Sequence, residues 1–338
     1  MKTYTFWNNK GGTGKTSLCF QTSLQYAIEH TNERILVIDL CPQANLSEYF
    51  LGGMLGNGAN HLKSLCPSQF LRTTIAGYFL DHIQSSYAMF PNFNKNKYIC
   101  KPYSYNANIP GNIYLVAGDN YVEDLSKSMS SLAANTLPTQ DAYVKILRWI
   151  IDFIDAVKDE FDVVFIDTNP SFSIYTQMAL AASENLIIPA SADDSSTQAM
   201  HNLLYMIYGI GNPIAGMNSD FYSEMKKFNM NLPKIHLVVR NHLTQYMGTA
   251  KAYDAVLKSL ETLAYSTKSH YPQHFTANPN LVIDIRDFNT VGQVAFAEAT
   301  AFSKIKAGLH VIGTNNIQLN SQNIEDCKGA IRSIVTLL

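Results

Sequence analysis

One short segment near the N-terminus constrains the fold more than any other part of the chain. Residues 10–16 read Lys-Gly-Gly-Thr-Gly-Lys-Thr. The β-branched and aromatic residues 4–7 before this segment are typical of a strand, and residues 17–29 after it carry apolar side chains at helical spacing. Glycines between a strand and a helix let the backbone curl, so that successive N–H groups point at one anion. The segment therefore predicts a phosphate-binding loop inside an α/β fold.

The loop follows the pattern Gly-x-x-x-x-Gly-Lys-Ser/Thr, except that Asn9 occupies the first position. Lys15 is expected to reach the β- and γ-phosphates of a nucleotide, and the Thr16 hydroxyl to hold Mg²⁺. A helix that starts near Thr16 would add its positive end to the same site. The predicted nucleotide-binding residues of the loop are Lys10, Gly11, Gly12, Thr13, Gly14, Lys15, Thr16 and Ser17.

Two later segments are apolar runs that end in an aspartate. Residues 34–39 end in Asp39, and residues 161–167 end in Asp167. A continuous apolar run is typical of a buried parallel strand, and ligands of open α/β sheets bind at the carboxyl ends of such strands. We therefore expect both carboxylates near the loop, where they would handle metal and water together with Thr16.

These segments together resemble the ParA/MinD ATPases. The loop with its additional first lysine resembles their deviant Walker A motif, and residues 39–45, Asp-Leu-Cys-Pro-Gln-Ala-Asn, resemble the Asp-x-Asp-Pro-Gln-x-Asn motif of ParA proteins. Residues 167–171, Asp-Thr-Asn-Pro-Ser, resemble the family's Walker B segment. The resemblance implies one domain over residues 1–338, with a doubly wound, mainly parallel sheet and helices on both faces. It fails between about 52 and 110, which predicts an insertion there.

The resemblance also implies a function, namely an ATP- and Mg²⁺-dependent dimerisation switch that acts in DNA partition or cargo positioning. In the family the first lysine, here Lys10, crosses the dimer interface to the partner's nucleotide, where a second cation neutralises phosphoryl charge. Lys10, Lys15 and Asp39 are accordingly the catalytic candidates. The implied partners are a second copy of the chain, non-specific DNA and a ParB-like adaptor, with a cytoplasmic location on the nucleoid or a plasmid.

Cys41 departs from the family motif, because it stands where the second aspartate would help to position the attacking water. A thiol is a weak hydrogen-bond acceptor with an ordinary pKa of about 8.5, so it replaces a carboxylate poorly. Binding and switching are expected to survive, and hydrolysis to be slow or impaired. The alternative is that other groups position the water.

Three further features leave two interpretations each. Asn241 ends a predicted strand at 234–241, where the family's asparagine often reads the adenine edge, and it would otherwise cap the strand end. Residues 52–110 are either a surface insertion or a partner-binding element, because long aromatic-bearing loops are often functional; residues 70–83 within them have helical spacing, with Leu71 on the apolar stripe. Five lysines in the second half of the chain are either ordinary solvated side chains or a DNA-binding patch. These residues are Lys226, Lys227, Lys251, Lys258 and Lys268.

Composition and two further predicted helices indicate which class of protein the chain belongs to. The chain has 338 residues, is 46% hydrophobic and 15% charged, and has no apolar run long enough to span a membrane. Its five cysteines lack Cys-x-x-Cys spacing, which is typical of reduced thiols. Helices are predicted over 138–159 and 321–338. Because the second helix has few basic residues, membrane binding of the MinD type is a weaker alternative to the partition function. A reductase resembling the nitrogenase iron protein would need paired cysteines such as Cys66 and Cys100.

Overall fold

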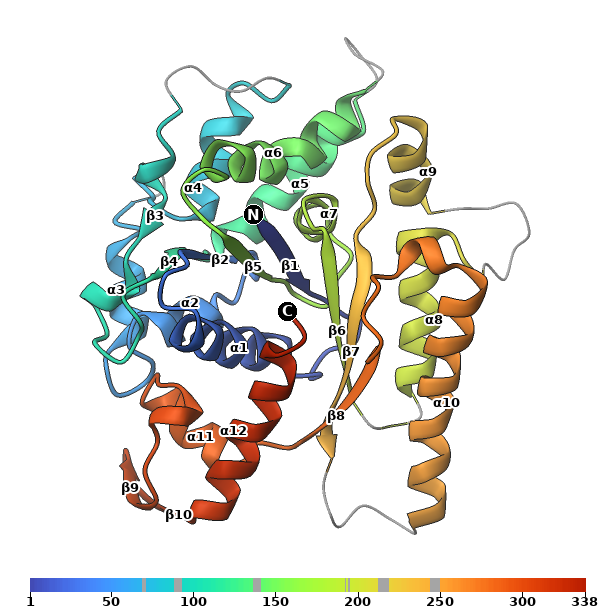
Figure 1. The fold of residues 1–338 in the computed structure, drawn as a ribbon. Helices are drawn as coiled ribbons and strands as arrows, with labels where there is room; N and C mark the ends of the chain where they lie inside the picture. Colours follow the sequence, from blue (N-terminus) through green and yellow to red (C-terminus); the bar gives the residue numbers. More distant parts are fainter. Residues whose placement is uncertain are drawn as a thin grey trace.

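The apolar runs found in the sequence form the central strands of a twisted sheet (Figure 1). The computed structural model describes residues 1–68, 71–87, 93–135, 141–191, 193, 195–211, 219–243 and 250–338, with the backbone alone for 242–243 and 250–257. Within these residues one sheet has eight strands in the order β3-β4-β2-β5-β1-β6-β7-β8. The strands are β1 (Lys2–Phe6), β2 (Ile35–Asp39), β3 (Ile99–Cys100), β4 (Ile113–Val116), β5 (Val163–Asp167), β6 (Asn185–Ser191), β7 (Lys234–Leu243) and β8 (Val282–Arg286).

The sheet is parallel except at one edge, where β3 pairs antiparallel with β4. Helices cover both faces, as predicted (Figure 1). The helices are α1 (Lys15–Glu29), α2 (Asn45–Phe50), α3 (Gly58–Ser64), α4 (Ile75–Ile83), α5 (Tyr121–Ala133), α6 (Ala142–Val157), α7 (Ile174–Ala181), α8 (Ser195–Tyr208), α9 (Asp220–Lys227), α10 (Ala250–His270), α11 (Asn289–Ala297) and α12 (Ser321–Val335). A two-stranded hairpin, β9 (Gly308–Ile312) and β10 (Asn315–Leu319), lies between α11 and α12 in the chain.

Alternation along β2 explains the two hydrophobic layers. Leu36 and Ile38 pack in the layer of α4 to α9, whereas Ile35 and Val37 pack in the layer of α1, α2, α11 and α12. Side chains of a strand point to opposite faces in turn, so a strand with apolar residues at every position must be covered on both sides. The doubly wound architecture follows from this pattern.

The predicted long helices are present with shorter bounds. Residues 142–157 of the predicted 138–159 form α6, and Ser321–Val335 of the predicted 321–338 form α12. Residues 138–140 lie outside the described residues.

The helix predicted over 70–83 begins only at Ile75, and the placement of Leu71 on its apolar stripe is wrong, because that side chain is 68% exposed. Residue 70 lies outside the described residues. The cause lies at the end of β4, where Asp119 accepts hydrogen bonds from Arg72 and Thr74. Thr74 is extended, with φ of −120°, so the chain enters α4 from a tethered segment rather than from an earlier helical turn.

Much of the segment between 52 and 110 packs inside the protein. Tyr78 and Phe79 of α4 are fully buried, and Tyr98 stacks edge-on against Tyr78 with ring centroids 5.5 Å apart. β3 extends the sheet by one strand. These contacts make the segment part of the hydrophobic core, while its status as an insertion relative to similar proteins stays a prediction.

Candidate functional site

The glycine-rich loop connects β1 to α1 at the carboxyl edge of the sheet. Gly12 and Gly14 have φ of 72° and 83°, a left-handed conformation that glycine adopts without strain. A Cβ built on Gly11 or Gly12 would meet no atom within 4 Å, so the backbone faces open space there. The Lys15 ammonium donates to the Lys10 carbonyl at 2.9 Å and is 6% exposed. The loop thus curls around its own lysine, while its role in binding phosphates stays a prediction.

Two asparagines hold the loop from behind. The Asn8 amide donates to the Pro189 carbonyl at 2.8 Å, and its oxygen accepts the Lys10 backbone N–H at 3.1 Å. The Asn241 amide donates to the Thr13 carbonyl at 3.3 Å, and this side chain is 1% exposed. The ends of β6 and β7 are therefore fastened to the loop. Adenine recognition by Asn241 stays a prediction; what the structure places at this residue is a contact with the loop backbone.

Asp39 and Asp167 lie opposite each other at the ends of neighbouring strands, because residues 35–39 of β2 pair in register with 163–167 of β5. The Thr16 hydroxyl donates to Asp167 Oδ2 at 2.7 Å. The other oxygen, Asp167 Oδ1, is buried without a hydrogen-bond partner among the described residues. A buried carboxylate oxygen without a donor is costly, so this atom is suited to a cation that the protein itself does not supply.

The charges at this edge are unbalanced. Burial, and next the Asp39 carboxylate, raise the pKa of Asp167 to about 8. Burial also raises the pKa of Asp39 to about 6, although hydrogen bonds from Ser47 and Cys41 oppose this rise. Burial lowers the pKa of Lys15 to about 8, and Asp167 works in the opposite direction. Two fully buried carboxylates beside one desolvated ammonium favour a bound divalent cation.

Asp39 is engaged differently from Asp167. Its Oδ1 accepts the Cys41 backbone N–H at 3.0 Å, and its Oδ2 accepts both the N–H and the hydroxyl of Ser47, at 2.9 and 2.7 Å. A Cβ built on Gly118 would lie 2.7 Å from Asp39 Oδ2, so only glycine fits there. Asp39 therefore fixes the turn that leads from β2 into α2. Of the two predicted metal carboxylates, Asp167 is the one with an oxygen that has no hydrogen-bond partner in the part of the chain that the structure describes.

Cys41 lies in this turn with 6% of its surface exposed. Its thiol donates to the Gln43 side-chain oxygen at 3.1 Å. Burial, followed by the Asp39 and Asp167 carboxylates, raises the pKa of Cys41 to about 12. The residue is therefore a neutral thiol at neutral pH, and its proton is directed at Gln43.

Lys10 forms an ion pair with Asp193, which follows β6. Asp193 also accepts the Ser195 backbone N–H at 3.1 Å at the start of α8. The side chains of Lys10 and Asp193 are 23% and 48% exposed, so the pair lies at the surface. In this structure the additional lysine is held within its own chain.

Sequence reasoning missed Ser47, Gly118 and Asp193. Asp193 follows the apolar run of β6, which is the signal that identified Asp39 and Asp167, and it could have been found by the same rule. Ser47 and Gly118 have no such signal, because their roles depend on the meeting of α2 with the end of β4.

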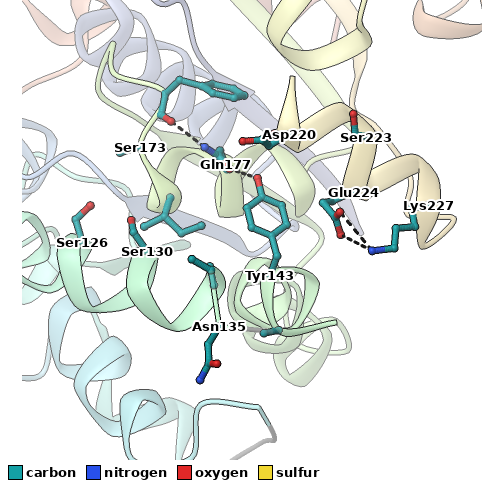
Figure 2. Close-up of a pocket in the computed structure, with 15 residues that line it drawn as sticks. Ser126, Ser130, Asn135, Tyr143, Ser173, Gln177, Asp220, Ser223, Glu224 and Lys227 are labelled. Atoms are coloured by element: carbon teal, nitrogen blue, oxygen red, sulfur yellow. Dashed lines mark hydrogen bonds and ion pairs between the residues drawn. The ribbon is translucent and has the colours of Figure 1, made fainter. Parts of the chain in front are cut away.

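A separate pocket of about 540 Å³ lies between α5, α6, α7 and α9 (Figure 2). Tyr143 points across it and donates to the Gln177 side-chain oxygen, and Glu224 pairs with Lys227 at the rim. None of the loop residues or the two strand-end aspartates lines it. This pocket is therefore distinct from the candidate nucleotide site.

The candidate DNA-binding lysines lie on two helices, Lys226 and Lys227 on α9 and Lys258 and Lys268 on α10. The Lys268 ammonium donates to the Asn278 carbonyl at 2.6 Å, and the side chain of Lys251 lies outside those described. In the part of the chain that the structure describes, no helix is long and apolar enough to cross a bilayer. Burial raises the pKa of the Cys66 thiol to about 11 and of Cys100 to about 12.

The fold and the loop together define a P-loop nucleotide-binding protein. A model of the AAA_31 family, described as an AAA domain, matches residues 1–220. The chain belongs to this family and is a ParA-like P-loop ATPase.

Relatives and solved structures agree with this assignment. The virulence plasmid ParA family protein pGP5-D of Chlamydia muridarum is 24% identical over 234 residues, which is 68% of this chain and 71% of that protein. A plasmid partition protein of Borrelia burgdorferi bound to AMPPNP has a TM-score of 0.55 at 16% identity, covering 100% of this chain and 99% of the other. A variant of McdA from Cyanothece in complex with ATP has a TM-score of 0.60 at 14% identity, covering 99% and 96%. These structural likenesses show the shared fold.

Proposed function

We propose that the protein is an ATP–Mg²⁺-dependent dimerisation switch of the ParA type, acting in DNA partition or cargo positioning. The observation that carries the proposal is the pairing of Thr16 with Asp167, whose second oxygen is buried without a described partner beside the Lys15 ammonium. A threonine hydroxyl and a carboxylate at the end of a phosphate-binding loop are the ligand types that Mg²⁺ takes in P-loop proteins. Similar proteins were solved with AMPPNP or ATP.

The residues present fit the nucleotide and the ion. The loop N–H groups of 11–16 would hold the phosphates, Lys15 would leave the Lys10 carbonyl for them, and Thr16 with Asp167 would hold Mg²⁺. When bound, Mg²⁺ supplies charge neutralisation of the phosphate oxygens. Its charge would also oppose both causes of the raised Asp167 pKa, namely burial of the carboxylate and next the repulsion by Asp39.

Lys10 is the residue proposed to make dimerisation depend on nucleotide. Its pair with Asp193 is surface-exposed, and an exposed ion pair contributes only about 0–1 kcal/mol. A partner's phosphates carry more charge than one carboxylate, so Lys10 can exchange Asp193 for a phosphate at low cost.

Slow hydrolysis is the second part of the proposal. A thiol with a pKa of about 12 that donates to Gln43 offers no lone pair comparable to a carboxylate for holding water. The ATP-bound dimer should therefore be long-lived. DNA and a ParB-like adaptor are the proposed partners, on the basis of partition proteins in the family.

The MinD-like and reductase alternatives have less support. Ile324, Ile331 and Ile334 of α12 pack in the hydrophobic layer that α12 shares with α1, α2 and α11. The apolar face of this helix is therefore occupied. Cys66 donates to Asp119 at 3.2 Å, which is a contact of a protonated thiol rather than a cluster ligand.

Light scattering with AMPPNP and Mg²⁺ tests the switch. The wild type should dimerise with nucleotide and be monomeric without it. Lys10→Ala should still bind nucleotide but stay monomeric, while Lys127→Ala, an exposed lysine on α5, should behave as wild type. A wild-type protein that stays monomeric with saturating nucleotide would refute the proposed role of Lys10.

A further inference from the structure

A second cavity, which the nucleotide site does not use, lies where the glycine-rich residues 52–58 meet the C-terminal part of the chain. Its volume is about 570 Å³, within the roughly 300–1,000 Å³ typical of small-molecule sites. The walls come from α2 and the turn after it, from the start of α3, from α11 and from the β9–β10 hairpin. Its lining includes Glu48, Tyr49, Met54, Phe296, Ile312 and Ile317.

Glycines bring the walls of this cavity together. Gly53 has φ of 61°, and a Cβ built on it would lie 2.5 Å from the Phe296 carbonyl oxygen. The Leu55 N–H donates to the Ala297 carbonyl at 2.9 Å, which fastens the turn to the end of α11. A side chain at residue 53 would force the two walls apart. The glycine at residue 53 therefore allows the turn to form one wall of the cavity.

An aromatic pair and a flexible thioether side chain line the cavity. Tyr49 and Phe296 stack with centroids 4.9 Å apart and an interplanar angle of 24°. Met54 is 68% exposed, and its methyl carbon would lie 3.7 Å from a Cβ built on Gly313, so this side chain reaches from one wall to the hairpin turn. Thioethers adapt to ligands of varied shape and contact aromatic rings favourably.

The polarity of the lining defines the class of ligand. Glu48 is the one charged residue among the described lining residues, and the remaining polar groups are mainly the amides of Asn57, Gln293 and Asn315. An anion would meet a carboxylate and no cation. The Tyr49–Phe296 pair is half-buried in this lining, and a flat apolar ring that packs against the pair gains aromatic contact.

We propose that this cavity is a binding site for a small, uncharged aromatic molecule. The site is also connected to the nucleotide edge. The short helix α2 carries Tyr49 in the cavity wall and, two residues earlier, Ser47, which donates twice to Asp39. A ligand that shifts the backbone of α2 would therefore also shift Ser47 and its contact with Asp39. This coupling, unlike the binding site, rests on the proposed function.

N-phenyl-1-naphthylamine, an uncharged aromatic fluorophore, tests the site in the full-length protein without nucleotide. Wild type should bind it saturably. Ala59→Trp, an exposed position on α3 that lines the cavity, should weaken binding at least about tenfold by filling the space. Ala107→Trp, at an exposed position outside this lining, should bind within about twofold of wild type. Absent binding, or equal binding by both variants, would overturn the site.

The coupling has its own measurement, namely the affinity for a fluorescent ATP analogue with and without saturating naphthylamine. A change in wild type that is lost in Ala59→Trp supports the connection through α2, since coupling between two ligands is reciprocal. An unchanged affinity overturns the coupling and leaves the cavity site intact. A protein that binds the naphthylamine but no nucleotide would refute the proposed function alone.

Discussion

Replacing Asp167 by asparagine should make the protein more stable when Mg²⁺ and nucleotide are removed. The folded protein buries this carboxylate beside Asp39 and raises its pKa from 3.8 to about 8. Because the folded state then binds a proton that the unfolded state releases, the contribution of this group to stability falls as pH rises from about 4 to about 8.

The magnitude follows from the pKa values. A solution pH of 7 is roughly three units above the pKa of this carboxyl in the unfolded chain. At about 1.4 kcal/mol per unit, burying the group lowers the free energy of unfolding by at most about 4 kcal/mol. Asparagine keeps an oxygen that accepts from Thr16, but its amide must still be buried, so we expect a gain of about 1–3 kcal/mol. For a chain of this size that is a few degrees in melting temperature.

The assay is thermal unfolding in EDTA at pH 7.5 and at pH 5. Asp167→Asn should melt higher than wild type at pH 7.5, with a smaller difference at pH 5. With ATP and Mg²⁺ the order should reverse, because a ligand at 100 times its Kd stabilises wild type by about 2.7 kcal/mol and the variant loses a metal ligand.

Asp119→Asn is the matched control, since Asp119 is also buried but is paired with Arg72 at 2.6 Å. Removing one partner of a buried pair should cost about 3 kcal/mol under all these conditions. If Asp167→Asn melts below wild type in EDTA at both pH values, the Asp167 carboxylate is not a source of instability and the argument for a missing cation fails.

Three other outcomes are expected. Lys15→Ala should abolish binding in a titration with a fluorescent ATP analogue, because the Lys15 ammonium lies inside the loop against the Lys10 carbonyl, where the phosphates would bind; unchanged affinity would place the nucleotide elsewhere. Cys41→Asp should raise phosphate release by about tenfold under matched conditions, below the roughly 10²–10⁴-fold of a well-placed carboxylate, because the site is shaped for a thiol; a fast wild type that slows on substitution would contradict this. With ATP, duplex DNA should bind weakly with a shallow salt dependence of about 0.9 log units per phosphate contact; no binding at about 50 mM salt would remove DNA from the proposed partners.

The parts of the site that could be predicted are those fixed by short segments. Strand, glycine loop and helix place Lys15 and Thr16, and an apolar run before an aspartate places Asp39 and Asp167 at one edge. Parallel pairing then makes the two carboxylates neighbours without further information.

The parts that could not be predicted depend on contacts between distant segments. The engagement of Asp39 by Ser47 depends on where α2 begins, and the exposure of Leu71 depends on Asp119, 48 positions away, which holds Arg72 and Thr74. Helical spacing at 70–83 carries no information about that carboxylate. Local periodicity was therefore overridden by a buried ion pair.

The residues that follow β4 contact two regions that are far apart in the sequence, namely the turn at Asp39 and the start of α4. Gly118 donates its N–H to Ser47 and leaves room only for the Asp39 carboxylate, while the next residue, Asp119, holds Arg72 and Thr74 ahead of α4. The peptide unit between Gly118 and Asp119 therefore lies between the strand-end aspartate and the segment that leads into α4. A shift of the Asp39 carboxylate would therefore meet this peptide unit first, and Arg72 and Thr74 connect the same unit to the start of α4.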